Sequence, residues 1–388
     1  MTNRNRASGL ARNAVANWSS FAFTAIVSFF LSPFIVQHLG ATRYGVWALL
    51  AGLVAYLALL DLGIRQAVSR YVARQRAVGE HEECSLIISA AIRLFGLLGI
   101  VAILLSGVVA FLAPSLFNIP EALANDTRII IVLGGLSVAV ALISGAFGGA
   151  LTGAERFDIS CYLEVFVTAT RTIAIVIALR EGYGLVMLAF IHLGASTLNC
   201  IVFWAAIDKL FAEWRLRFRG VWLPQGRALL SFAASLSVIF FLTKLISYSD
   251  SVIIAAFLPI EAVTFFVIAG SLCVYAKELI LSLSYVMTPR VSALTSIGSD
   301  RVAGEILAVA GIATLVAAPM AVTFVIRGES FITLWMGSAY GLASGEVLRL
   351  LAVVVWLEAA GSVVIHTLMG MGKQSVLIPG VAAAAACK

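Results

Sequence analysis

Charged residues are scarce in this chain of 388 residues. Asp, Glu, Lys and Arg together make up 12% of it, about half of the roughly 25% that is usual in soluble domains. A soluble domain needs a charged surface, and no stretch of the sequence is polar enough to supply one. The scarcity therefore excludes a hidden soluble domain, and it makes each remaining charge informative.

Cysteine motifs and nucleotide-binding motifs are also missing. The five cysteines are scattered, without CxxC or Cys/His spacing, at Cys84, Cys161, Cys200, Cys273 and Cys387. This spacing argues against a disulfide framework or a metal site, and small packing residues are the better interpretation. No GxxxxGK[ST] loop is present, so ATP is not expected to be the direct energy source. We expect no catalytic residue, no metal and no cofactor.

Hydrophobic residues dominate, at 61% of the chain with a mean hydropathy of +1.03. A spanning helix needs about 20 apolar residues at a rise of about 1.5 Å each. We predict spans at 13–39, 44–66, 86–113, 129–152, 159–179, 184–208, 228–258, 263–287, 305–326 and 346–368, with a partial one from 375. An open sheet would leave backbone groups unpaired in hydrocarbon, so we predict an all-α polytopic membrane protein.

The basic residues alternate between the two sets of loops. One set holds 16 Lys and Arg residues, beginning with Arg4, Arg6 and Arg12, whereas the other holds 5. Because Lys and Arg concentrate in cytoplasmic loops, the N-terminus is predicted to lie in the cytoplasm. Topology explains the net charge of +6 better than nucleic-acid binding does.

A basic connection at 209–227 divides the spans into two sets. We predict an N-terminal six-helix bundle at 1–208 and a C-terminal bundle of about five helices at 228–388. Three short segments recur at a spacing near 219 residues, and the first pair is HLGATRYGVWALLAG and FLPIEAVTFFVIAG. An even number of helices separates the copies, so the halves are predicted to form a parallel repeat around a central cavity. The second bundle is then expected to be C-terminally incomplete.

Four basic residues within or beside the spans are candidates for binding an anionic substrate: Arg171, Lys277, Arg93 and Lys244. An ionisable group at membrane depth is costly and is therefore a functional candidate. Arg171 lies about 12 residues, or roughly 18 Å, into the fifth predicted span, too deep to reach either headgroup layer comfortably. Arg93 could instead snorkel to the cytoplasmic boundary.

Five carboxylates are candidates for ion coupling: Glu358, Asp250, Glu278, Glu164 and Asp61. Glu164 and Arg171 are seven residues apart, which places them on one face of a helix, where a structural charge pair is the alternative. Asp61 and Arg65 could pair locally at spacing four. Asp250 could be solvated at the outer end of its span, and His192 is expected to be an ordinary interfacial residue.

The opening segment HLGATRYGVWALLAGLVAYLALLDLGIRQAVSRYVA, with GALTGAERFD after the fourth span, resembles the polysaccharide-exporting flippases of bacteria. These are the O-antigen transporter type of the multidrug/oligosaccharidyl-lipid/polysaccharide (MOP) exporter superfamily. The resemblance covers essentially the whole chain, and MTPR at 287–290 is also similar. It implies two six-helix bundles around a cavity that opens alternately to each side of the membrane. Relatives with 12 to 14 spans make this chain look short at its C-terminus.

The resemblance implies a cargo and a set of partners. The cargo would be a polyprenyl-pyrophosphate-linked oligosaccharide, exported across the bacterial cytoplasmic membrane by a protein that is not an enzyme. The expected partners are the lipid bilayer, a coupling ion (H⁺ or Na⁺), and a polysaccharide polymerase and glycosyltransferases, but no nucleic acid. Two alternatives remain open: an ion-coupled efflux pump for organic cations, and a non-transporting scaffold for glycan assembly.

Overall fold

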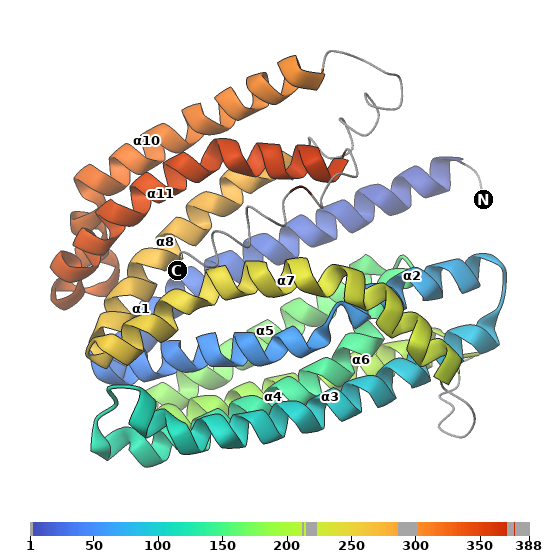
Figure 1. Cartoon of the computed structure of the whole chain (residues 1–388), viewed down its shortest axis with the longest axis horizontal. Coiled ribbons are helices and arrows are strands. Elements are labelled where there is room, and N and C mark those ends of the chain that lie inside the picture. The colour runs from blue at the N-terminus through green and yellow to red at the C-terminus, as the bar shows by residue number, and fades with distance from the viewer. Residues whose placement is uncertain (1–2, 212, 215–222, 286–301, 371–375, 377–388) are drawn as a thin grey trace. The chain divides into compact units, whose positions relative to one another are not determined.

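A computed structural model describes residues 3–211, 213–214, 223–285, 302–370 and 376. Within these ranges, side chains are described except at 3–15, 223, 232–247, 282–285, 302–303, 305 and 369–370. The described chain is helical (Figure 1). Its helices are α1 (Asn3–Leu57), η1 (Ala58–Asp61), α2 (Ile64–Ala77), α3 (His81–Leu116), α4 (Glu121–Gly153), α5 (Phe157–Arg180), α6 (Leu185–Leu210), α7 (Leu223–Phe257), α8 (Ile260–Tyr285), α10 (Val302–Met336) and α11 (Ser338–Gly370).

The helices are those of a multi-pass membrane protein. In the described residues, eight helical stretches are long and apolar enough to cross a bilayer, and the first of them runs from Ala16 to Ala77. Large apolar side chains stand exposed along them, such as Phe111 at 77% and Leu334 at 87%. Exposed apolar surface of this kind suits contact with lipid rather than with water. The predicted all-helical membrane fold is confirmed.

The boundary between the first two predicted spans is confirmed, but the end of the second differs from the prediction. Gly40 interrupts α1 with a φ of 75° and a ψ of 170°, a conformation that suits glycine. The second span was predicted to continue to residue 66, yet α1 ends at Leu57 and α2 begins at Ile64. Leu62 and Gly63 between them have left-handed φ values of 51° and 81°. Hydropathy misses this break because the residues around it remain mostly apolar.

The chain divides into two compact units. The N-terminal unit comprises Met1–Leu39 and Leu49–Tyr248, and the C-terminal unit comprises Gly40–Ala48 and Ser249–Lys388. The predicted bundle boundaries at 208 and 228 stay a prediction, as does the partial span from 375, which lies outside the described residues except at 376.

Helix α4 is the centre of the N-terminal unit. It packs against α3, α6, α2 and α5, and α3, α4 and α6 run side by side (Figure 1). Two glycines let α2 approach closely, because a Cβ at Gly149 would lie 2.7 Å from the Arg65 carbonyl oxygen. A Cβ at Gly153 would lie 2.5 Å from that of Ser69. Small residues four apart allow this kind of close helix packing in membranes. The contact fixes the start of α2, and Arg65 with it, against α4.

The C-terminal unit packs α8, α10 and α11 against one another, with α10 and α11 side by side in Figure 1. The short turn Gly40–Ala48 also belongs to this unit. There the Thr42 hydroxyl donates a 2.7 Å hydrogen bond to Glu261, and the Thr264 hydroxyl donates one of 2.6 Å to the carbonyl of Ala41. Thr42 and Glu261 are 219 residues apart, so this bond joins the two segments of the predicted repeat.

Candidate functional site

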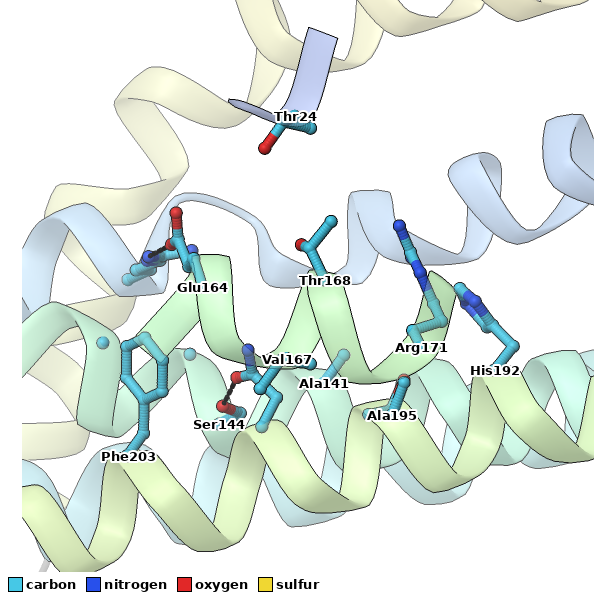
Figure 2. A pocket seen from close by; sticks show the side chains of 15 residues that line it. Thr24, Ala141, Ser144, Glu164, Val167, Thr168, Arg171, His192, Ala195 and Phe203 are labelled. Carbon is cyan, nitrogen blue, oxygen red and sulfur yellow. Dashed lines mark hydrogen bonds and ion pairs between the residues drawn. The ribbon is translucent and has the colours of Figure 1, made fainter. Parts of the chain in front are cut away.

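A cavity of about 440 Å³ opens within the N-terminal unit. Its lining comes from five helices: Thr24 from α1, Arg65 from α2, Ser144 from α4, Arg171 from α5 and His192 from α6 (Figure 2). A volume of this size falls within the range of roughly 300–1,000 Å³ usual for small-molecule sites. The cavity lies among helices that are otherwise apolar enough to span a membrane.

A smaller cavity of about 220 Å³ adjoins it and shares Arg65, Ala141, Gly145, His192 and Ser196 with the larger one. Asp61 lies in its wall, just before the left-handed break that precedes α2. The backbone N–H of Arg65 donates a 3.1 Å hydrogen bond to the Asp61 carboxylate. Asp61 thus stabilises the first turn of α2, where backbone donors have no partner within the helix.

One end of the larger cavity is cationic. Arg171 lies about 21 Å along a helix of about 36 Å, which is close to the middle of α5. His192 lies beside it in Figure 2. Among the described residues, no carboxylate lies within 4 Å of the Arg171 guanidinium. A half-buried cation without a counter-ion at this depth is costly, so the cavity must supply water or an anionic guest.

The other end carries a loosely joined pair of charges. The guanidinium of Arg65 lies 4.0 Å from the Glu164 carboxylate, and both side chains are nearly half exposed to the cavity. The same guanidinium rests against α4 at Gly148, where a Cβ would come within 3.1 Å of it. Exposed pairs at this separation contribute little to stability, about 0–1 kcal/mol. Arg65 is therefore held in place by packing more than by Glu164.

Neutral hydrogen-bonding groups line the wall between the two ends. The Ser144 hydroxyl on α4 donates a 2.6 Å hydrogen bond to the Asn199 side-chain oxygen on α6, shown as a dashed line in Figure 2. This bond orients the Asn199 amide, whose nitrogen can donate to a guest. Thr168 and Ser196 add hydroxyls to the same lining. The cavity therefore offers cations for an anion, and neutral donors and acceptors for hydroxyl groups.

The C-terminal unit holds a second group of charges at membrane depth. The ammonium of Lys277 on α8 lies 2.5 Å from the Glu358 carboxylate on α11, with the side chains 41% and 56% exposed. We expected these residues to serve substrate and coupling ion separately, and the structure brings them together. Glu278 follows Lys277 on α8 and is half-buried.

The remaining predicted residues are dispersed. Arg93 is half-buried on α3, and Asp250 is half-buried on α7. The side chain of Lys244 lies outside the described residues. Glu164 and Arg171 line one cavity, which confirms that their spacing places them on one face. The roles assigned to all these residues stay predictions.

Several cavity residues escaped the sequence analysis. His192 was expected at the membrane interface, but it lines both cavities. Arg65 was expected to pair locally with Asp61, and its backbone N–H does bond to that carboxylate, but the direction of its guanidinium toward Glu164 was not foreseen. Ser144 and Asn199 were not singled out. An amide within an apolar span was the available signal, because a polar group there needs a partner or a wet cavity.

The family profile described as "Polysaccharide biosynthesis protein" matches residues 10–295. The "Uncharacterized membrane protein EpsK" of Bacillus subtilis (strain 168) is 24% identical over 165 residues, which cover 42% of this chain and 33% of that protein. The aligned segment thus spans about a third of this relative's length.

Solved structures share the fold. The inward-facing conformation of a multidrug resistance MATE family transporter of the MOP superfamily has a TM-score of 0.80 at 16% identity, covering 92% of this chain and 83% of that one. The lipid II flippase MurJ, in an inward closed conformation, has a TM-score of 0.67 at 14% identity, covering 95% and 78%. At these identities the likeness concerns the fold alone.

Proposed function

Because the chain belongs to the polysaccharide biosynthesis protein family and shares the fold of a transporter of the MOP superfamily, we propose that it carries a polyprenyl-pyrophosphate-linked oligosaccharide across the bacterial cytoplasmic membrane. In this proposal the N-terminus is cytoplasmic, and the cargo's lipid tail stays in the bilayer while its headgroup passes through protein. The family match confirms the resemblance found in the sequence. The identity of the cargo is what we propose beyond this family match.

The cavity of the N-terminal unit is the observation that carries this proposal. Its larger chamber contains two arginines, Arg65 and Arg171, and one carboxylate, Glu164. Guanidinium groups bind phosphate oxygens through charge-assisted hydrogen bonds, which are about twice as strong as neutral ones. Arg171 is the better site for a pyrophosphate, because no carboxylate of the described residues competes for it within 4 Å.

The neutral hydrogen-bonding groups between the two ends of the cavity can bind the sugar hydroxyls. A headgroup cannot enter hydrocarbon alone, because each hydroxyl that loses its hydrogen bonds costs several kcal/mol, about 4–8 in a fully apolar medium. Ser144, Asn199, Thr168 and Ser196 supply such bonds inside the protein. A wet polar cavity therefore lowers the barrier to translocation.

We further propose that transport proceeds by alternating access and is coupled to H⁺ or Na⁺. Glu164 is the candidate for coupling in the N-terminal unit, because it faces the cavity and is only loosely joined to Arg65. Asp61 is less suitable, since its carboxylate is engaged by the first turn of α2.

An efflux pump for organic cations is the less favoured alternative. Such a cargo needs an acidic or aromatic site, whereas the larger cavity has two arginines against one carboxylate, and Arg171 would repel a cation. A scaffold for glycan assembly would not require Arg171, which has no carboxylate within 4 Å in the described part of the chain, to face a cavity.

Complementation tests the proposal. The gene is expressed in a bacterial strain that lacks its own surface-polysaccharide flippase, and surface glycan is measured alongside the amount of protein inserted in the membrane. We expect surface glycan to be restored. A well-inserted protein that restores no glycan, tested with several lipid-linked repeat units, would contradict the assignment. Resistance to organic cations without glycan export would favour the efflux pump.

A further inference from the structure

The ion pair between Lys277 and Glu358 is unusual for its place. Lys277 lies about 12 Å before the end of α8, and Glu358 about 18 Å before the end of α11. Both helices are apolar enough to span a membrane. Two charges this far from the helix ends are not explained by capping or by simple solvation at a loop.

The exposure of the pair gives a second clue. The two side chains are 41% and 56% exposed, although they touch at 2.5 Å. A pair that served only to join α8 to α11 would be expected within the packed contact, where Ala276, Val355 and Ala359 are almost fully buried. Ionisable groups at this depth almost always face a bundle interior or a water-filled space, so we expect the exposed side of the pair to face a polar space rather than lipid.

From this geometry we infer that Glu358 is an internal substitute for the cargo's phosphate: it neutralises Lys277 in the empty carrier and is displaced when a phosphate anion binds there. The inference rests on the proposed function and adds an anion site in the C-terminal unit.

Electrostatics explain why a carrier needs such a substitute. A lysine left alone at membrane depth would be an uncompensated charge whenever the carrier is empty. With Glu358 in contact, the empty site is neutral. When phosphate binds, Lys277 stays neutralised and the Glu358 carboxylate is released into the polar space. Lys277 thus has a counter-ion in both the loaded and the empty state.

The same logic makes Glu358 a competitor. Any anion that binds Lys277 must displace a carboxylate already in contact, so the apparent affinity equals the intrinsic affinity multiplied by the fraction of time that Lys277 is free of Glu358. Removing Glu358's charge should therefore tighten anion binding. A purely structural pair predicts no such gain, because its loss would loosen the unit and leave anion binding unchanged or weaker.

The experiment measures the binding of inorganic pyrophosphate to the full chain, by calorimetry in nanodiscs of phosphatidylcholine. We expect Glu358→Gln to tighten binding about fivefold to tenfold. The gain should disappear in the Lys277→Gln/Glu358→Gln double variant, which is the test of a direct interaction between the two residues. Size-exclusion profiles and thermal unfolding establish that each variant is folded.

A matched control lies in the same unit. Glu329 and Arg349 form a 2.8 Å ion pair between α10 and α11, with exposures of 40% and 45%. Glu329 packs against the α11 backbone, since a Cβ at Gly345 would lie 2.9 Å from its own Cβ. It therefore has little freedom to make way for an anion, and Glu329→Gln should leave pyrophosphate affinity unchanged.

Three outcomes of the pyrophosphate titration in phosphatidylcholine would overturn the inference: Glu358→Gln fails to tighten binding, Glu329→Gln tightens it equally, or the gain survives in the double variant. Repeating the titration in nanodiscs that contain phosphatidylglycerol identifies the source of the phosphate. If Glu358→Gln changes only the retention of that lipid, the ligand is a bilayer lipid and the inference is also overturned. Failure of the proposed function looks different, because surface glycan is then not restored by the unaltered protein either.

Discussion

The two units of this chain hold charge at membrane depth in different ways. In the N-terminal unit the charges are spread around a cavity, with Arg65 and Glu164 4.0 Å apart and Arg171 without a carboxylate within 4 Å among the described residues. In the C-terminal unit Lys277 and Glu358 are in contact at 2.5 Å. The first arrangement is open to an anionic guest, whereas the second already contains its own anion. The separation of opposite charges therefore decides whether a site is open to an anionic guest or already occupied by a carboxylate of the chain itself.

The largest expected effect comes from removing the open cation. Arg171→Ala should lower glycan export about tenfold to a hundredfold, because hydrogen bonds to charged groups contribute about 1.5–3 kcal/mol. Arg171→Lys should be intermediate, since lysine keeps the charge but loses the bidentate geometry. Export is measured as surface glycan in the complemented strain.

The control for this change is on the same helix. Arg180 is the exposed last residue of α5, so Arg180→Ala should leave export near its original level. Equal losses of export in both variants would mean that any positive charge on α5 supports transport. Arg171 would then not be a specific anion site.

The next effect concerns the packing that places Arg65 in the cavity. Gly153→Leu should lower the free energy of unfolding by about 1–3 kcal/mol, because the added side chain overlaps Ser69 and Val72 of α2. Thermal unfolding of the purified protein measures it. Gly194→Leu on α6 is the control, since a Cβ there meets no atom within 4 Å. If both variants unfold alike, α2 is not held by this contact.

A smaller effect is expected from the neutral wall. Asn199→Ala should reduce export about threefold to tenfold, because it removes one donor to the sugar and leaves the Ser144 hydroxyl without its acceptor, at about 0.5–1.5 kcal/mol. Thr197→Ala should have little effect, since that exposed hydroxyl bonds to the carbonyl of Leu193 on its own helix. Unchanged export in the Asn199 variant would contradict the claim that these neutral groups bind the sugar.

The smallest effect compares the two ion pairs directly. Glu164→Gln should change pyrophosphate affinity by less than about threefold, because a half-exposed pair at 4.0 Å is weak. Glu358→Gln should change it more. A larger change in pyrophosphate affinity for Glu164→Gln than for Glu358→Gln would contradict the claim that the C-terminal site, rather than the N-terminal one, is occupied by its own carboxylate.

The sequence predicted the helices better than it predicted their contacts. Apolar runs are sufficient to locate spans, and a seven-residue spacing places Glu164 and Arg171 on one face. Spacing within one helix does not reveal how neighbouring helices are rotated, so the approach of Arg65 to Glu164 and of Lys277 to Glu358 could not be foreseen. His192 looked interfacial for the same reason, because only the packing of α6 beside α5 directs it into the cavity.

The most direct test of the central claim is the accessibility of Thr168, which lies in the cavity lining near Arg171. In a variant with all five native cysteines replaced by alanine, Thr168→Cys is exposed to a water-soluble maleimide, which reacts with the thiolate that forms only in contact with water. We expect rapid labelling that inorganic pyrophosphate slows. A folded protein whose Cys at this position is not labelled, or is labelled equally fast with and without pyrophosphate, would contradict it.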